Sequence, residues 1–334
     1  MIQNLTQFLN GIPFFSSVWF GVIAMVIVGG SWCLVGLVMG DAPKRGIEPS
    51  LVQLFGACFS ILAGLVIMLI ALGTHIIRLE QVPVCSWKIW LPVCLTYATA
   101  GALNFVMLQV MSYAMQRGPN GIIWSIIQSA LIFPFLGGVL FFGVLLTPFR
   151  AGGILTLLAA LVLCGLAKDQ KTGVRTSEKK RGWRGAAFLC LAICAVQQNL
   201  MTAPSYFEDA RAVTSIARSL ATASGTFLGA LVYNLLRMNA ERLAQLRSNL
   251  GRWTLWRYII ALQFFGLVFS YTLFYPGMNV MADAGLGGIC YPMMVGSCIV
   301  TFSLASVCLL KERMTLLQAI ALTVCITGLV LICL

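Results

Sequence analysis

A small set of polar and aromatic side chains stands near the middle of long apolar segments of this 334-residue chain, where hydrogen-bonding or charged groups are rare. The amides among them donate and accept hydrogen bonds together, and the aromatic rings offer a flat apolar face. A polyhydroxylated ligand needs both kinds of contact. We therefore predict a small-molecule site formed by Trp32, Asn104, Gln128, Gln197, Arg218, Tyr271 and Tyr291.

Each of these residues also has a structural explanation. An Asn or Gln in a membrane helix often hydrogen-bonds to a neighbouring helix, and Tyr291 is equally explained as a packing aromatic. Arg218 is the costliest residue, because a guanidinium inside a span carries an insertion penalty of about 2.5–3.5 kcal/mol. It either faces a cavity, where it binds an anionic group or takes the place of a cation, or it snorkels to the nearer membrane surface.

The sequence offers little for acid–base or metal chemistry. No Asp or Glu lies in the central half of an expected span, which argues against ion coupling through an intramembrane carboxylate. Asp283 is the best-placed acid for such coupling, although an acid favoured by the dipole at a helix start explains it equally well. The chain has no HExxH, GxSxG or P-loop motif and no metal-ligand spacing, so we predict no enzyme activity, metal or cofactor.

The elements that carry these residues are predicted to be membrane spans. The chain is 60% apolar and 10% charged, with a mean hydropathy of +0.93, and a soluble fold cannot hide so much apolar surface. Its apolar runs exceed the roughly 20 residues of a spanning helix and lack the alternation of membrane strands. We expect an all-α integral membrane protein with ten transmembrane helices, at 17–39, 51–73, 89–115, 120–146, 149–167, 184–205, 212–236, 255–280, 285–310 and 315–334.

The basic residues orient these spans. Of the 22 Lys and Arg, 17 fall in the loops on one side of the expected membrane, four fall on the other side, and Arg218 lies within a span. The positive-inside rule then predicts a multi-pass protein of the cell inner membrane with both termini on the non-cytoplasmic side. The net charge of +12 reflects this segregation, so the expected partners are the lipid bilayer and a small molecule, and not nucleic acid.

The chain divides into two blocks of five spans. We expect an N-terminal extension at 1–16, a first five-helix repeat at 17–167, a basic cytoplasmic linker at 168–182 and a second five-helix repeat at 183–334. Because five is odd, the second block enters the membrane in the opposite sense, which is the inverted-repeat plan of many secondary transporters. Leucines at helical spacing in Arg237–Arg252 predict an interfacial amphipathic helix.

Several short motifs resemble a known transporter family. The stretch LKERMTLLQ at Leu310–Gln318, followed by an apolar span with Gly328, resembles the closing signature of the drug/metabolite transporter superfamily, whose architecture is two inverted five-helix repeats. The chain is most similar to the bacterial L-rhamnose:proton symporter group, through KRGIE at Lys44–Glu48, the aromatic run Gln263–Tyr275 and the expected placement of the termini. The resemblance implies transport of a sugar such as L-rhamnose by alternating access, coupled to a proton or another cation.

Two other functions remain open. One is export of amino acids, amphiphiles or drugs, in which Arg218 would hold an anionic group. The other belongs to a different class, a membrane scaffold or lipid-handling protein that transports nothing. Ligand-induced stabilisation of the folded protein separates a carrier from a scaffold.

Overall fold

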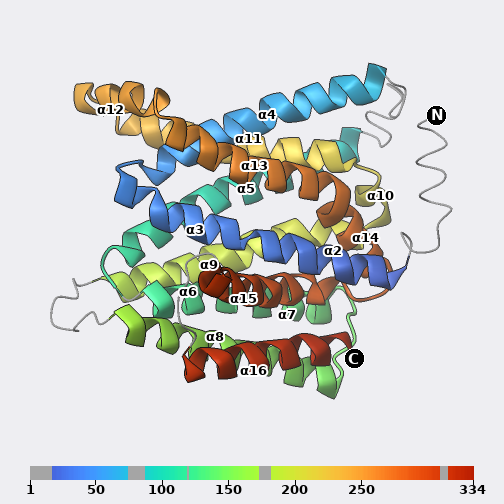
Figure 1. Cartoon of the computed structure of the whole chain (residues 1–334). Coiled ribbons are helices and arrows are strands. Elements are labelled where there is room, and N and C mark those ends of the chain that lie inside the picture. The colour runs from blue at the N-terminus through green and yellow to red at the C-terminus, as the bar shows by residue number, and fades with distance from the viewer. Residues whose placement is uncertain (1–16, 74–86, 119, 173–181, 309–314) are drawn as a thin grey trace.

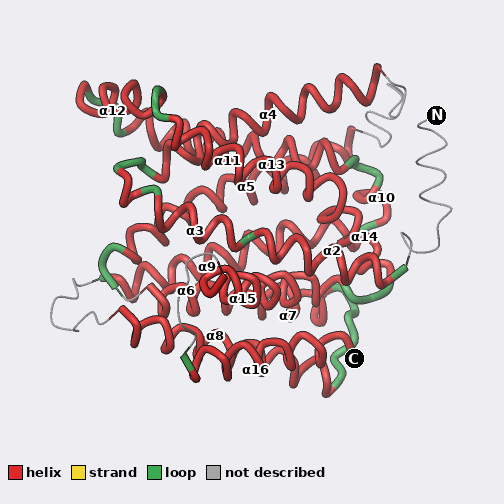
Figure 2. The backbone as a smooth tube through the Cα atoms, viewed as in Figure 1, coloured by secondary structure: helices red, strands yellow, loops and turns green. Residues whose placement is uncertain are grey.

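The described part of the chain is an all-helical bundle. The computed structural model describes residues 17–73, 87–118, 120–172, 182–308 and 315–334, and no strand occurs within these ranges (Figure 2). In lipid, a helix satisfies every backbone hydrogen bond within its own segment, so long apolar runs fold this way. The prediction of an all-α, multi-pass membrane protein is confirmed, since nine helices of the described ranges are long and apolar enough to cross a bilayer.

Within each described range, the helices follow one another with short connections (Figure 1). Two of the spanning stretches are interrupted near their middle, so that each consists of consecutive shorter helical elements. The spanning elements are α2 (Val18–Ser31) with α3 (Cys33–Asp41), α4 (Pro49–Gly73), α5 (Trp87–Met115), α6 (Asn120–Gln128) with η3 (Ser129–Leu131) and α7 (Ile132–Phe141), α8 (Pro148–Thr172), α9 (Trp183–Thr202), α11 (Ser215–Leu236), η7 (Gly287–Ile289) with α15 (Cys290–Cys308), and α16 (Leu316–Cys333). The shorter elements are η1 (Pro43–Arg45), η5 (Ala203–Tyr206), α10 (Glu208–Arg211) and α12 (Ala240–Leu250).

One further stretch is helical from Trp253 to Asp283. It consists of α13 (Trp253–Phe269), the π-helical turn η6 (Ser270–Phe274) and α14 (Tyr275–Asp283). It covers the eighth expected span, at 255–280, but the π-turn divides it, so that neither part alone reaches the length of the other nine. π-turns of this kind occur often at functional sites.

The predicted boundaries are correct at most positions and wrong at a few. The fourth span was expected to continue to 146, but α7 ends at Phe141, because Gly143 turns the chain with a φ of 69°. The expected linker at 168–182 begins later, since α8 continues to Thr172. Residues 1–16, 173–181 and 309–314, which include parts of the expected extension, linker and closing signature, lie outside the described residues.

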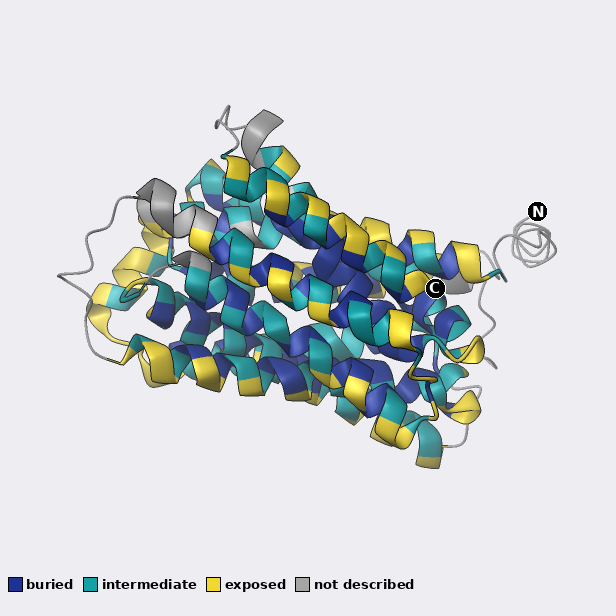
Figure 3. Ribbon diagram, turned by 90° about the horizontal axis from the view of Figure 1, so that it is seen from below, coloured by how far each residue is buried: buried dark blue, intermediate teal, exposed yellow. Residues whose placement is uncertain are grey.

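The bundle is held together where glycines allow backbones to meet. A Cβ on Gly225 of α11 would lie 1.8 Å from the Ala98 carbonyl oxygen of α5, and a Cβ on Gly101 would lie 2.0 Å from the Thr222 carbonyl oxygen. Close approach of small residues is the main source of helix association in membranes. In Figure 3 the buried residues face the interior of the bundle and the exposed ones gather on its outside, as expected for helices surrounded by lipid.

Two ends of the bundle can be distinguished. We call the end where α2 begins and α16 finishes the N/C end, and the opposite end, which carries α12, the α12 end (Figure 1). The most extensive helix–helix contacts are α2 with α14 and α15, α4 with α11 and α13, α5 with α9 and α11, α6 with α8 and α9, α8 with α16, and α15 with α16.

A polar clasp ties distant segments together at the α12 end. Arg242 of α12 forms two close contacts with the Glu48 carboxylate, Nη1–Oε2 at 2.5 Å and Nη2–Oε1 at 2.6 Å. Its Nη2 also donates to Ser50 Oγ at 3.0 Å and to Asn234 Oδ1 at 2.9 Å. Nearby, the Tyr258 hydroxyl donates to the Asp41 carboxylate. The loop that precedes α4 is thereby fastened to α11, α12 and α13.

The clasp predicts an energetic coupling between Glu48 and Arg242. In a double-mutant cycle with Glu48→Gln and Arg242→Gln, we expect a coupling of about 1–2 kcal/mol, because both side chains are more than three-quarters buried and bidentate. The matched control is the exposed pair Asp41–Arg45, for which we expect below about 0.5 kcal/mol. Free energies of unfolding in mixed micelles provide the measurement, and equal coupling in the two pairs would show that the clasp is only a surface contact.

Candidate substrate cavity

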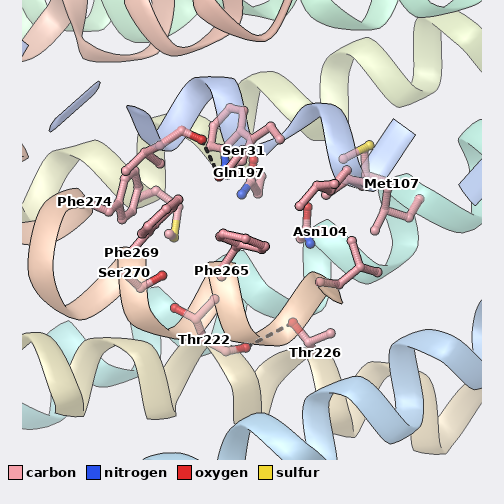
Figure 4. A pocket seen from close by; sticks show the side chains of 18 of the residues that line it. Ser31, Asn104, Met107, Gln197, Thr222, Thr226, Phe265, Phe269, Ser270 and Phe274 are labelled. Atoms are coloured by element: carbon pink, nitrogen blue, oxygen red, sulfur yellow. Dashed lines mark hydrogen bonds between the residues drawn. The ribbon is translucent and has the colours of Figure 1, made fainter. Parts of the chain in front are cut away.

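A cavity of about 340 Å³ lies at the centre of the bundle. This is within the range of roughly 300–1,000 Å³ found for small-molecule sites. On α4 and α5 its lining residues lie in the halves nearer the α12 end, so the cavity extends from mid-bundle towards that end. Figure 4 shows side chains from several helices arranged around this space, with Asn104 and Gln197 directed into it.

The lining is mainly apolar, with uncharged polar groups set among its apolar side chains. Six amide side chains line the cavity, namely Gln53, Asn104, Gln128, Gln197, Gln198 and Gln263. Hydroxyl groups come from Ser31, Ser60, Ser219, Thr222, Thr226, Ser270, Tyr275 and Tyr291, and apolar faces from Trp32, Trp124, Phe265, Phe269 and Phe274. No Asp, Glu, Lys or Arg is among the described residues that line it. This arrangement is suited to a neutral ligand with several hydrogen-bonding groups.

Five of the seven residues predicted to bind a ligand line this cavity, namely Trp32, Asn104, Gln128, Gln197 and Tyr291. They come from different elements, and two of them lie at helix breaks. Trp32 separates α2 from α3, and Gln128 is the last residue of α6 before η3. The Trp32 and Tyr291 rings meet with centroids 5.9 Å apart, so the two aromatics form one wall.

The amides at the centre are not used to join helices. Among the described residues, the side chains of Asn104, Gln128 and Gln197 make no hydrogen bond, whereas Gln263 accepts one from Ser60 at 2.5 Å. An amide that only fastens helices would find a partner on a neighbouring helix. The geometry therefore favours a ligand-binding role for the first three amides and a packing role for Gln263.

Sequence reasoning missed several lining residues on α4 and α11. From the sequence alone, we did not single out Gln53, Ser60, Ser219, Thr222 or Thr226. A spacing of three, four or seven residues places side chains on one helix face, and both sets have it. On each of the two helices, polar residues along one face of an otherwise apolar span were the sequence signal that could have identified these lining residues.

Arg218 lies beside the cavity and not in its wall. Its side chain is fully buried at 0% exposure, so the alternative that it snorkels to the membrane surface is wrong. Nη2 donates to the Ala210 carbonyl at 2.9 Å and Nη1 donates to Asn279 Oδ1 at 3.1 Å. Its Cζ lies 5.7 Å from the centres of both the Tyr97 and Tyr275 rings. The guanidinium is thus held by two carbonyl oxygens and two aromatic faces.

Tyr97, Arg218 and Tyr275 form what we call the closing layer, on the N/C side of the cavity. Each of the three is at most 1% exposed. The layer touches the cavity through Tyr275, whose hydroxyl lies 3.3 Å from Thr222 Oγ1, and Tyr97 donates to the Met201 carbonyl at 3.4 Å. Towards the N/C end the cavity is therefore shut by packed aromatic rings around a buried cation.

Neither Tyr271 nor Asp283 is among the described residues that line the cavity. Tyr271 belongs to the π-turn η6, and its side chain lies outside what the structure describes. Asp283 is the last residue of α14 and not the first of the next helix, so the explanation by a helix N-terminal dipole is wrong. Its side chain, 59% exposed, forms an ion pair with Arg211 at the N/C end. Because α14 continues to Asp283 before Gly285 turns the chain, the acid lies at the surface, away from the cavity.

Comparison with known proteins identifies the fold alone. No family model matches the sequence, and no curated protein matches it. Among 24 matching chains of solved structures is one described as the crystal structure of a protein. It is 14% identical, has a TM-score of 0.63, and aligns over 95% of this chain and 96% of its own length. The whole helical arrangement therefore occurs in a chain of very different sequence.

Proposed function

We propose that this chain is a secondary transporter that moves a small, neutral, polar metabolite through the central cavity by alternating access. The single observation that carries the proposal is the uncharged, amide-rich cavity at mid-bundle, shut towards one end by a closing layer. Alternating-access carriers bind substrate near the bilayer midplane, between two repeats. The amides suit hydroxyl groups and the Trp32–Tyr291 wall suits the apolar face of a sugar ring, so we propose a monosaccharide such as L-rhamnose.

The helix order supports an arrangement of ten spans in two inverted repeats. Helices of the first half begin at Val18, Pro49, Trp87, Asn120 and Pro148, and those of the second half at Trp183, Ser215, Trp253, Gly287 and Leu316. Corresponding starts are separated by 165 to 168 residues, which is close to a constant offset. Counting α13 to α14 as one span gives five spans in each half, and an odd number reverses the second half relative to the first.

The helix contacts support the same pairing. Exchanging each helix for its counterpart converts the contact of α5 with α9 into that of α14 with α2, and the contact of α6 with α8 into that of α15 with α16. Likewise the contact of α4 with α13 corresponds to that of α11 with α5. Two halves that exchange in this way would rock against each other around a site at their interface, with the α12 end on the cytoplasmic side by the positive-inside rule.

Substitution of one central amide tests the site. We expect Asn104→Leu to lower the affinity for a bound monosaccharide by about five- to tenfold, because a lost hydrogen bond to substrate removes on the order of 1–1.5 kcal/mol. The measurement is ligand-induced thermal stabilisation of the purified protein with a panel of monosaccharides, amino acids and nucleosides. Gln109→Leu is the matched control, since this amide is on the same helix but outside the cavity lining.

The panel also separates the competing functions. Stabilisation by monosaccharides that is weakened in Asn104→Leu but retained in Gln109→Leu supports a sugar carrier. Stabilisation by amino acids or hydrophobic amines would favour the exporter. A protein that no small molecule stabilises would favour a scaffold, and the proposal would be abandoned.

A further inference from the structure

The short helix α12 presents three different faces. With about 3.6 residues per turn, Arg242, Leu246 and Asn249 share one face. This face is turned to the bundle, since Asn249 is 1% exposed and Arg242 is held in the polar clasp with Glu48. A second face, about 100° around the helix from the first, carries Glu241, Gln245 and Ser248, which are all exposed and hydrophilic.

The third face of α12 is apolar and basic. It carries Leu243, which is 40% exposed, and Leu250, with Arg247 exposed beside them. An apolar stripe bordered by arginine, opposite a hydrophilic face, is typical of a helix that lies in a membrane interface. Leu243 and Arg247 on this side of α12 are exposed in the described structure, so the face is available to a partner.

The residues that flank α12 in the sequence also include exposed apolar and basic side chains. Before it, Leu236 is 83% exposed and the exposed Arg237 lies over the Tyr233 ring at 4.4 Å. After it, Trp253 is 67% exposed, and Arg257 follows one turn later on the same helix face. This face of α13 continues into exposed Ile260 and Phe264, so it meets the lipid tails.

We propose that α12 and its flanks bind the headgroups of anionic phospholipids through Arg237, Arg247 and Arg257. The apolar side chains fix the depth of the helix at the lipid boundary, and a tryptophan such as Trp253 is a common anchor at this level. Arginines there attract anionic headgroups, because a leaflet that contains such lipids has a negative surface potential. The only acid of α12, Glu241, lies on the opposite face. The proposal does not depend on the proposed transport function.

The test uses the full-length protein in lipid nanodiscs. One set contains neutral phosphatidylcholine alone, and the other replaces a third of it with phosphatidylglycerol. Hydrogen exchange of the peptides that cover residues 237–257 is the readout. We expect exchange in α12 to be about tenfold slower in the anionic nanodiscs, and about 1 M salt to remove the difference by screening.

Substitutions at the three arginines distinguish an effect of their charge on lipid binding from an effect on the folding of α12. The triple substitution Arg237→Gln, Arg247→Gln and Arg257→Gln should remove the lipid dependence, while the corresponding lysine triple should keep it. The matched control neutralises Arg117, in the turn that follows α5, and Arg184, at the start of α9, which lie at the same end of the bundle, and should behave as the wild type. Equal protection in neutral and anionic nanodiscs, or a lipid response retained by the glutamine triple, would overturn the proposal.

Discussion

Replacing Gly225 with valine is expected to prevent the bundle from assembling. Even a Cβ at this position would lie 1.8 Å from the Ala98 carbonyl oxygen and 2.5 Å from its carbon, and both are backbone atoms that cannot rotate away. The α5 and α11 backbones would have to separate, which breaks the closest crossing in the bundle and the Thr226 hydrogen bond to the Gly101 carbonyl. We expect a destabilisation of more than about 3 kcal/mol, at the upper end of overpacking effects.

Yield of monodisperse protein and its melting temperature measure this effect. Gly152→Val is the matched control, because it adds the same side chain to a helix where a Cβ meets nothing within 4 Å. We expect this variant to be folded and close to the wild type in stability. A monodisperse Gly225→Val protein with the same melting temperature would contradict the packing of α5 on α11 described here.

Replacing Arg218 with methionine is expected to separate folding from transport. The guanidinium is fully buried, and withdrawing a cation from water carries a penalty of several kcal/mol that its neutral partners only partly offset. Methionine has a similar length and no charge, so we expect the melting temperature to be unchanged or raised. When the closing layer of the wild type opens, water reaches Arg218 and the desolvation penalty is removed, which favours opening. Methionine lacks this contribution, so we expect transport by the variant to fall by at least about 30-fold, which corresponds to roughly 2 kcal/mol.

The measurements for this variant are the melting temperature and the initial rate of substrate counterflow. Arg150→Met, at the start of α8 and outside the cavity lining, is the matched control and should transport within about twofold of the wild type. An Arg218→Met protein that is stable and transports normally would show that the buried charge has no part in opening the closing layer.

Most of the fold could be predicted because its determinants are local. The apolar runs are long enough to cross a bilayer, and the basic residues are concentrated in every second loop between them. These two patterns place the helices to within a few residues. The errors come from features that such patterns do not record. α7 stops early at a glycine with a positive φ, and α13 is interrupted by a π-turn that depends on neighbouring helices.

The candidate site was predictable in part, for a physical reason. Polar side chains such as Asn104 and Gln197 stand out in an apolar span, and they do line the cavity. Whether a polar residue faces a cavity or a helix crossing depends on rotation about the helix axis, which the sequence of one span does not fix. Arg218 shows this, because it lies within an expected span like the amides but is enclosed by Tyr97 and Tyr275.

Counterflow of L-rhamnose into proteoliposomes tests the central claim most directly. Vesicles loaded with unlabelled L-rhamnose are diluted into a trace of labelled sugar, and no ion gradient is needed for exchange. The account predicts a transient accumulation of label above its equilibrium level with the wild type and with Gln109→Leu, and about five- to tenfold less with Asn104→Leu. If purified wild-type protein accumulates neither L-rhamnose nor any other neutral monosaccharide in this assay, the assignment of the cavity to sugar transport is contradicted.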